Sequence, residues 1–118
     1  MQLKIRISFR DEQGSFMGIG LVWLLKGINK HNSINKAAQE MSLSYPKAIR
    51  ILNRLEEATK VKILNRQRGG PQGGGASLTE FGQNFLNQFE QFNQDVTEYA
   101  QKKFIEDFEN NDLFVRTG

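Results

Sequence analysis

Three basic side chains in the middle of the sequence have a spacing that suggests binding chemistry. Lys47, Arg50 and Arg54 are three and four residues apart, so they form one stripe if residues 45–59 are helical. The apolar side of the same helix would consist of Ala48, Ile51, Leu52 and Leu55. A helix with these two faces can pack in a core and still present cations to a polyanion.

This helix is the second half of a predicted helix-turn-helix at residues 33–59. Ser33 and Ser44 are each placed to cap a helix, because a serine hydroxyl can accept a free N–H group of the first turn. Pro46 is tolerated in the first turn of the second helix, where its missing N–H has no intrahelical partner. Residues 42–44 supply the polar turn between the two helices.

A glycine-rich segment with two arginines follows the helix-turn-helix. Residues 62–79 read KILNRQRGGPQGGGASLT, in which Arg66 and Arg68 precede five glycines that begin with Gly69 and Gly70. The apolar residues at both ends predict a β-hairpin, and glycine lets backbone N–H groups approach phosphate closely. Beside a recognition helix such a hairpin is the wing of a winged helix, which contacts the DNA backbone or the minor groove. A plain flexible loop is the alternative interpretation.

The first 32 residues predict an N-terminal hairpin and a buried helix. Apolar residues alternate with polar or basic ones at Leu3, Ile5, Ile7 and Phe9, which is the period of a half-buried strand. We therefore expect a short β-hairpin over residues 3–18, with its basic side chains solvating the outer face. Between residues 20 and 30 apolar residues recur at helical spacing, and Asn32 can end that helix in the left-handed conformation.

A long helix is expected over residues 80–109, capped by Thr79, with a frayed tail at residues 110–118. Five apolar side chains in it are spaced four, three, four and three residues apart and form a heptad seam: Phe85, Phe89, Phe92, Val96 and Tyr99. Because exposed aromatic patches usually bind a partner, the seam predicts a homodimer through this helix. The alternative is that the helix folds back and these residues join the core.

The composition indicates one domain with an uneven charge distribution. The chain has 118 residues, which is enough for a single core. Residues 1–79 hold 13 Lys or Arg and 5 Asp or Glu, for a net +8, whereas residues 80–118 hold 3 and 8, for a net −5. The basic part, which contains the helix-turn-helix, is therefore the part expected to face a polyanion.

The sequence argues against several other classes of protein. The absence of cysteine excludes disulfides and thiolate metal sites and suits a reducing cytoplasm, and neither a membrane-spanning run nor a signal peptide is visible. A nucleotide-binding P-loop fits poorly, because Ala76 occupies the lysine position of that motif. The sole histidine, His31, has no base-and-nucleophile arrangement beside it, and Glu56 and Glu57 are interpreted as solvated charges. No enzyme, metal site or cofactor is predicted.

Three segments together carry a family resemblance. They are SINKAAQEMSLSYPKAIRILNRLEE from residue 33, LNRQRGG from residue 64 and SLTEFGQNFL from residue 77. In combination they resemble the N-terminal winged-helix domain of ModE-type, molybdate-responsive regulators, a relative of the LysR-type DNA-binding domain. The resemblance implies that the DNA-facing start of the recognition helix and the wing contain Ser44, Tyr45, Lys47, Arg50, Arg66 and Arg68.

The sequence departs from this family pattern in two respects. Asn32 stands where the family often has glycine, and Pro46 is less usual at its position, so the entry to the recognition helix is expected to differ in detail. Regulators of this type often carry C-terminal molybdate-binding domains, and nothing after residue 79 resembles one. Oxyanion sensing is therefore not expected of this chain.

These patterns predict an α+β, mostly α winged helix-turn-helix, with residues 1–79 as its core and residues 80–109 as a helix of the same domain. Its expected function is sequence-specific binding of double-stranded DNA, as a homodimer that regulates transcription. Arg50 and Lys47 are the expected readers of base edges. Phosphate or minor-groove contacts are expected from Lys36, Ser44, Tyr45, Arg54, Arg66, Arg68, Gly69 and Gly70. The alternative is a winged-helix protein-interaction module that binds no DNA.

Overall fold

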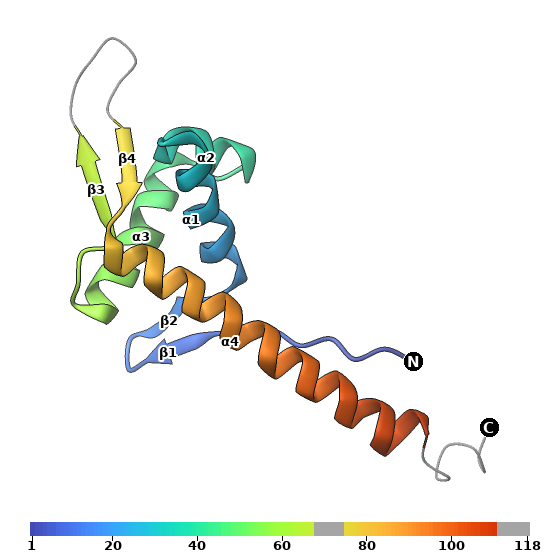
Figure 1. The fold of residues 1–118 in the computed structure, drawn as a ribbon. Helices are drawn as coiled ribbons and strands as arrows, with labels where there is room; N and C mark the ends of the chain where they lie inside the picture. Colours follow the sequence, from blue (N-terminus) through green and yellow to red (C-terminus); the bar gives the residue numbers. More distant parts are fainter. Residues whose placement is uncertain (68–74, 111–118) are drawn as a thin grey trace.

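The computed structural model describes residues 1–67 and 75–110 of the chain (Figure 1). Its helices are α1 (Ile19–His31), α2 (Ile34–Glu40), α3 (Tyr45–Thr59) and α4 (Glu80–Phe104), and α4 continues into a short π-helical segment, η1 (Ile105–Glu109). Its strands are β1 (Phe9–Asp11), β2 (Gly14–Met17), β3 (Leu64–Gln67) and β4 (Gly75–Leu78), which pair as two antiparallel hairpins. This is the mostly α winged helix-turn-helix predicted from the sequence.

Capping residues set the helix ends where the sequence predicts them. The hydroxyl oxygens of Ser33, Ser44 and Thr79 each accept the backbone N–H of the residue three positions further on, at 3.1, 3.2 and 3.0 Å. Asn32 has a φ of 51° and ends α1 in the left-handed conformation. The helix boundaries are thus decided by local chemistry.

The core lies between α1, α2, α3, the wing and the first half of α4. Its largest fully buried side chains are Leu24, Leu25, Ile28, Leu52, Leu55, Ile63 and Leu86. Helices α1 and α2 cross closely at Gly27, where an added Cβ would lie 2.8 Å from the Cβ of Ala37. This packing fixes α3 with one face in the core and the opposite face in solvent.

Strands β3 and β4 form the base of the wing and stand beside α3 (Figure 1). Their register pairs Leu64 with Leu78 at the base and Gln67 with Gly75 at the last described pair. The hairpin predicted from the sequence is therefore confirmed. The predicted wing residues Arg68, Gly69 and Gly70 lie outside the described residues.

Glu56 joins α3 to the wing. Its Oε2 accepts the backbone N–H groups of Ile63 at 2.8 Å and Leu64 at 3.3 Å. The prediction that Glu56 is a solvated charge is therefore wrong, because the carboxylate satisfies backbone donors at the start of β3. This contact sets the position of the wing relative to α3.

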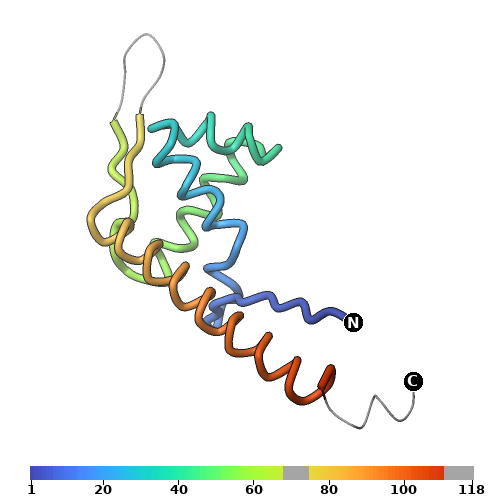
Figure 2. Tube along the Cα trace, turned by 45° about the vertical axis from the view of Figure 1, so that its right-hand side comes forward, coloured from blue at the N-terminus to red at the C-terminus, as the bar shows by residue number. Residues whose placement is uncertain are grey.

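The N-terminal hairpin is shorter than predicted, because β1 begins at Phe9 and not at residue 3. Residues 1–8 still show the expected alternation, with Leu3, Ile5 and Ile7 half-buried between exposed neighbours. They form no ladder, because β2 ends at Met17 and the chain then turns into α1. This extended segment instead runs beside the later turns of α4, where the Leu3 carbonyl accepts the side-chain amide of Gln101 (Figure 2).

Helix α4 begins in the core and then extends beyond the rest of the domain (Figures 1 and 2). Leu86 and Phe89 are buried, and the Phe9 ring of β1 meets Phe89 edge-on at 4.9 Å. Phe89 therefore belongs to the core, which corrects its prediction as a seam residue. At 25 residues α4 is about 37 Å long, so its second half projects from the core.

Candidate nucleic-acid interface

The outer face of α3 carries the polar side chains of the predicted recognition helix. Lys47, Arg50, Asn53 and Glu57 are all exposed on this face, whereas Ala48, Leu52 and Leu55 are buried. Lys47 and Arg50 have no ion-pair partner among residues 1–67 and 75–110. Glu57 places a negative charge near the C-terminal end, so the cationic surface is confined to the first half of the helix.

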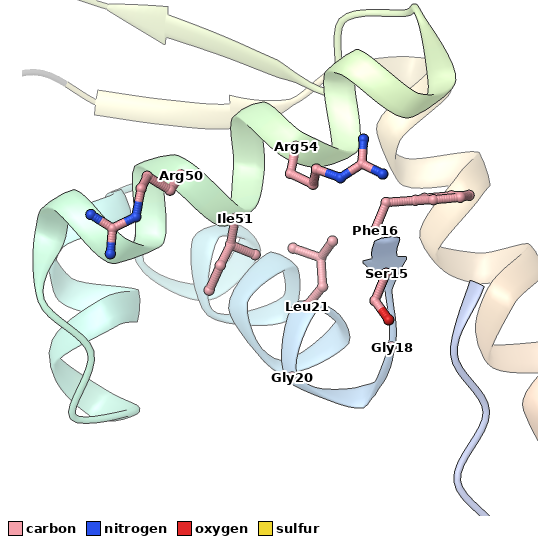
Figure 3. A pocket seen from close by; sticks show the side chains of 8 residues that line it. All are labelled: Ser15, Phe16, Gly18, Gly20, Leu21, Arg50, Ile51 and Arg54. Carbon is pink, nitrogen blue, oxygen red and sulfur yellow. The ribbon is translucent and has the colours of Figure 1, made fainter. Parts of the chain in front are cut away.

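Arg54 occupies a different environment from Arg50, although both are basic residues of the predicted stripe. Figure 3 shows their side chains directed away from each other, with Arg54 directed towards Phe16 of the N-terminal hairpin. Arg54 forms an ion pair with Asp11, donates to the Gly14 carbonyl at 3.0 Å and lies 5.9 Å from the Phe16 ring centre. Because of these contacts, the Arg54 guanidinium binds groups of the domain itself and does not belong to the outward-facing row of Lys47 and Arg50.

The start of α3 presents two hydroxyl groups near the turn. Ser44 is exposed, and its oxygen already caps α3, while Tyr45 is 47% exposed. Lys36, on α2, is exposed as well and has no ion pair within the described part of the chain. The structure therefore leaves all three accessible, as the phosphate contacts predicted from the sequence require.

The wing approaches the outer face of α3 through Arg66. The Nη2 of Arg66 donates to the Oδ1 of Asn53 at 3.4 Å, and both side chains are exposed. Asn53 is not among the contact residues predicted from the sequence, although its position three residues after Arg50 follows the same helical spacing as the basic stripe. Asn53 therefore completes an outward row with Lys47 and Arg50.

The predicted seam of α4 divides into a packed part and an exposed part. Phe85 is half-buried and Phe89 is buried, whereas Phe92, Val96 and Tyr99 are 47%, 36% and 68% exposed. Lys103 follows this row and forms an ion pair with Asp107 at 3.2 Å, which raises the pKa of Lys103. The exposed part of the predicted seam thus consists of Phe92, Val96 and Tyr99, and Phe81 in the first turn of α4 is 39% exposed as well.

The rest of the described chain offers little that could do other chemistry. His31 contacts the Glu40 carboxylate at 2.7 Å, and hydrogen bonding to His31 lowers the pKa of Glu40. This exposed pair joins the ends of α1 and α2. Within residues 1–67 and 75–110, no group of three or more metal-ligating side chains gathers, and no helix is long and apolar enough to cross a membrane.

Helix α3 thus presents a cationic row beside a hairpin, on a helix-turn-helix scaffold. This arrangement defines the chain as a winged helix-turn-helix protein. Residues 23–83 match the model of the bacterial regulatory helix-turn-helix proteins of the lysR family. The match spans more than half of the chain, so the chain belongs to this family, which is one of transcription regulators and not of enzymes.

Similar proteins are named ModE, which confirms the resemblance to ModE-type regulators. The DNA-binding transcriptional dual regulator ModE of Escherichia coli (strain K12) is 30% identical over 90 residues, covering 76% of this chain and 34% of that protein. The molybdenum transport protein ModE of Azotobacter vinelandii is 31% identical over 81 residues, covering 69% of this chain and 30% of that protein. The transcriptional regulator ModE of Haemophilus influenzae is 31% identical over 87 residues, covering 74% of this chain and 34% of that protein. The chain spans about one third of the length of these relatives.

Proposed function

We propose that this chain binds double-stranded DNA sequence-specifically, with α3 in the major groove, and regulates transcription. The observation that carries the proposal is the outward row of Lys47 and Arg50, which are exposed and free of ion pairs within the described residues. An exposed cationic helix face supplies both the attraction to phosphate and the donors that read base edges. Membership of a regulatory helix-turn-helix family supports the same function.

The proposed contacts divide into base readers and backbone contacts. Arg50 and Lys47 donate to base edges, with guanine as the natural partner of Arg50. Phosphate or minor-groove contacts come from the turn, from α2 and from the wing: Ser44, Tyr45, Lys36, Arg66, Arg68, Gly69 and Gly70. Arg54 is not proposed as a DNA contact, because its guanidinium binds Asp11 and Gly14 within the domain.

The active species is proposed to be a homodimer formed through α4. Phe92, Val96 and Tyr99 give the second half of α4 an exposed apolar row, which begins beside the domain where Phe92 meets the Phe9 ring at 5.8 Å. A second copy of the chain packed on this row would present two recognition helices to successive major grooves, about one helical turn apart. The half-buried Phe85 lies at the core end of this row.

Selection of bound sequences from random duplex DNA, with the mass of the protein measured in solution, tests this function. We expect enrichment of two-fold-symmetric sites and the mass of a dimer. Enrichment of an unsymmetrical single site by a monomer would retain DNA binding and reject the dimer. No enrichment of any sequence would reject sequence-specific binding and favour a winged-helix module that binds another protein.

A further inference from the structure

Among the described residues, the outward row of α3 consists of Lys47, Arg50 and Asn53. Lys47 and Arg50 are cations, whereas the side chain of Asn53 is an uncharged amide. It lies one turn after Arg50, on the side of the helix that faces the wing, where Arg66 contacts it. Arg54, the next residue, faces the N-terminal hairpin on the other side. The exposed surface of α3 is therefore bordered by the wing at Asn53 and by the hairpin at Arg54.

The contact with Arg66 fixes which end of the Asn53 amide faces the wing. A guanidinium has only donors, so the atom that meets Arg66 Nη2 at 3.4 Å is the carbonyl oxygen of the amide. The Nδ2 group, with two N–H donors, has no hydrogen-bond partner among the described residues. The oxygen also keeps a second lone pair, because a carbonyl can accept two hydrogen bonds.

An asparagine amide held in this way matches adenine. In the major groove adenine presents the N7 acceptor beside the N6 donor, and an asparagine amide can pair with both atoms at once. The free Nδ2 donors suit N7, and the free lone pair of Oδ1 suits N6–H. None of the other base edges in the major groove shows this donor and acceptor arrangement.

We propose that Asn53 reads an adenine in each half-site and that Arg66 is a positioning residue, which orients the Asn53 amide for that base. This inference rests on the proposed DNA-binding function. It gives Arg66 a role in sequence choice, in place of the backbone contact proposed for it above. The adenine would lie beyond the base read by Arg50, in the direction of the C-terminal end of α3.

The two roles of Arg66 have different signatures in binding measurements. A phosphate contact weakens binding to every sequence equally and contributes about one unit to the salt slope. A positioning residue changes the preference at one base pair, and its effect disappears once Asn53 is removed. The two residues are therefore tested together.

The experiment applies random-duplex selection and salt-dependent binding to wild type, Asn53→Ala, Arg66→Ala and the double variant. Wild type should select adenine at one position of the half-site, and Asn53→Ala should lose that preference, with roughly 5- to 150-fold weaker binding to the selected site. Arg66→Ala should weaken the same preference and leave the salt slope unchanged. The double variant should have the same base preference at that position as Asn53→Ala alone.

Asn84→Ala is the matched control, because Asn84 is an exposed asparagine of α4 whose side chain has no hydrogen bond among the described residues. It should retain the selected sequence. If wild type selects a site and Asn53→Ala selects the same one, the inference fails and the proposed function stands. If Arg66→Ala flattens the salt slope and leaves the adenine preference intact, Arg66 contacts phosphate and the positioning role fails. If wild type selects no sequence, the proposed function itself fails.

Discussion

The guanidinium of Arg54 binds the carboxylate of Asp11, and its Nη2 also donates to the carbonyl oxygen of Gly14 at 3.0 Å. These contacts join α3 to the turn between β1 and β2, which is 40 residues or more away in the sequence. A basic residue of α3 therefore stabilises the fold. Arg50, one turn earlier, remains available to a ligand.

Replacing Arg50 with alanine should weaken binding to the selected DNA site and relax its sequence preference. We expect a loss of about 1 to 3 kcal/mol in binding free energy, because a bidentate contact to a base edge is removed. Titration of wild type and Arg50→Ala against the selected site and a site changed at one base pair measures both effects. Unchanged affinity and sequence choice would remove Arg50 from the interface.

Replacing Arg54 with alanine should instead act on stability. The variant loses the ion pair with Asp11, the hydrogen bond to Gly14 and the contact with Phe16, so its thermal unfolding midpoint should fall below that of Arg50→Ala. The salt slope of DNA binding should match that of wild type, because no phosphate contact is lost. A salt slope reduced by about one unit would show that Arg54 contacts DNA after all.

The pair of Asp11 and Arg54 should make stability depend on pH in the acidic range. The hydrogen bond from Arg54 holds the pKa of Asp11 below its usual value, so the ion pair stabilises the fold above about pH 4 and the contribution is lost as pH falls through the lowered pKa. Urea unfolding of wild type and Asp11→Asn between pH 2 and pH 7 measures this difference. The free energies of unfolding of the two proteins should converge towards pH 2. A difference that stays constant from pH 2 to pH 7 would show that the ion pair of Asp11 and Arg54 does not stabilise the fold.

Gly82 should tolerate no side chain, because a Cβ at this position would lie 2.4 Å from the backbone oxygen of Ile63. Gly82→Ala should therefore force α4 away from the base of the wing and destabilise the domain by several kcal/mol, in the range of severe core substitutions. Gly20→Ala is the control, because nothing lies within 4 Å of its added Cβ and alanine favours a helix by about 1 kcal/mol. In thermal melts, the unfolding midpoint should fall for Gly82→Ala and rise for Gly20→Ala.

A charge in the exposed row of α4 should break the proposed dimer. Tyr99 is 68% exposed, so Tyr99→Glu should leave the fold intact while it places a carboxylate in the apolar contact. Sedimentation should show a shift from dimer to monomer, and Asn84→Glu, which adds the same charge elsewhere on α4, should remain a dimer. A Tyr99→Glu variant that stays dimeric would place the interface on another surface.

The sequence by itself determined the features that depend on near neighbours in the chain. Ser33, Ser44 and Thr79 cap their helices through residues three positions away, and Asn32 ends α1 through its own backbone conformation. Helical spacing also predicted the buried side of α3, and the apolar residues at both ends of the glycine-rich segment predicted the hairpin after it. Each of these follows from interactions within a few residues, which the order of amino acids alone specifies.

Only the tertiary structure decided which polar residues of α3 face outwards and which apolar residues of α4 remain exposed. Helical spacing allows both Asn53 and Arg54 to border the stripe, and docking of the hairpin and the wing on opposite sides gives them different partners. Phe89 and Phe92 follow the same heptad pattern and both meet the Phe9 ring edge-on, at 4.9 and 5.8 Å, but Phe89 is buried in the core and Phe92 is 47% exposed. These outcomes depend on contacts between segments 40 or more residues apart for Arg54 and about 80 apart for Phe9, which no local pattern encodes.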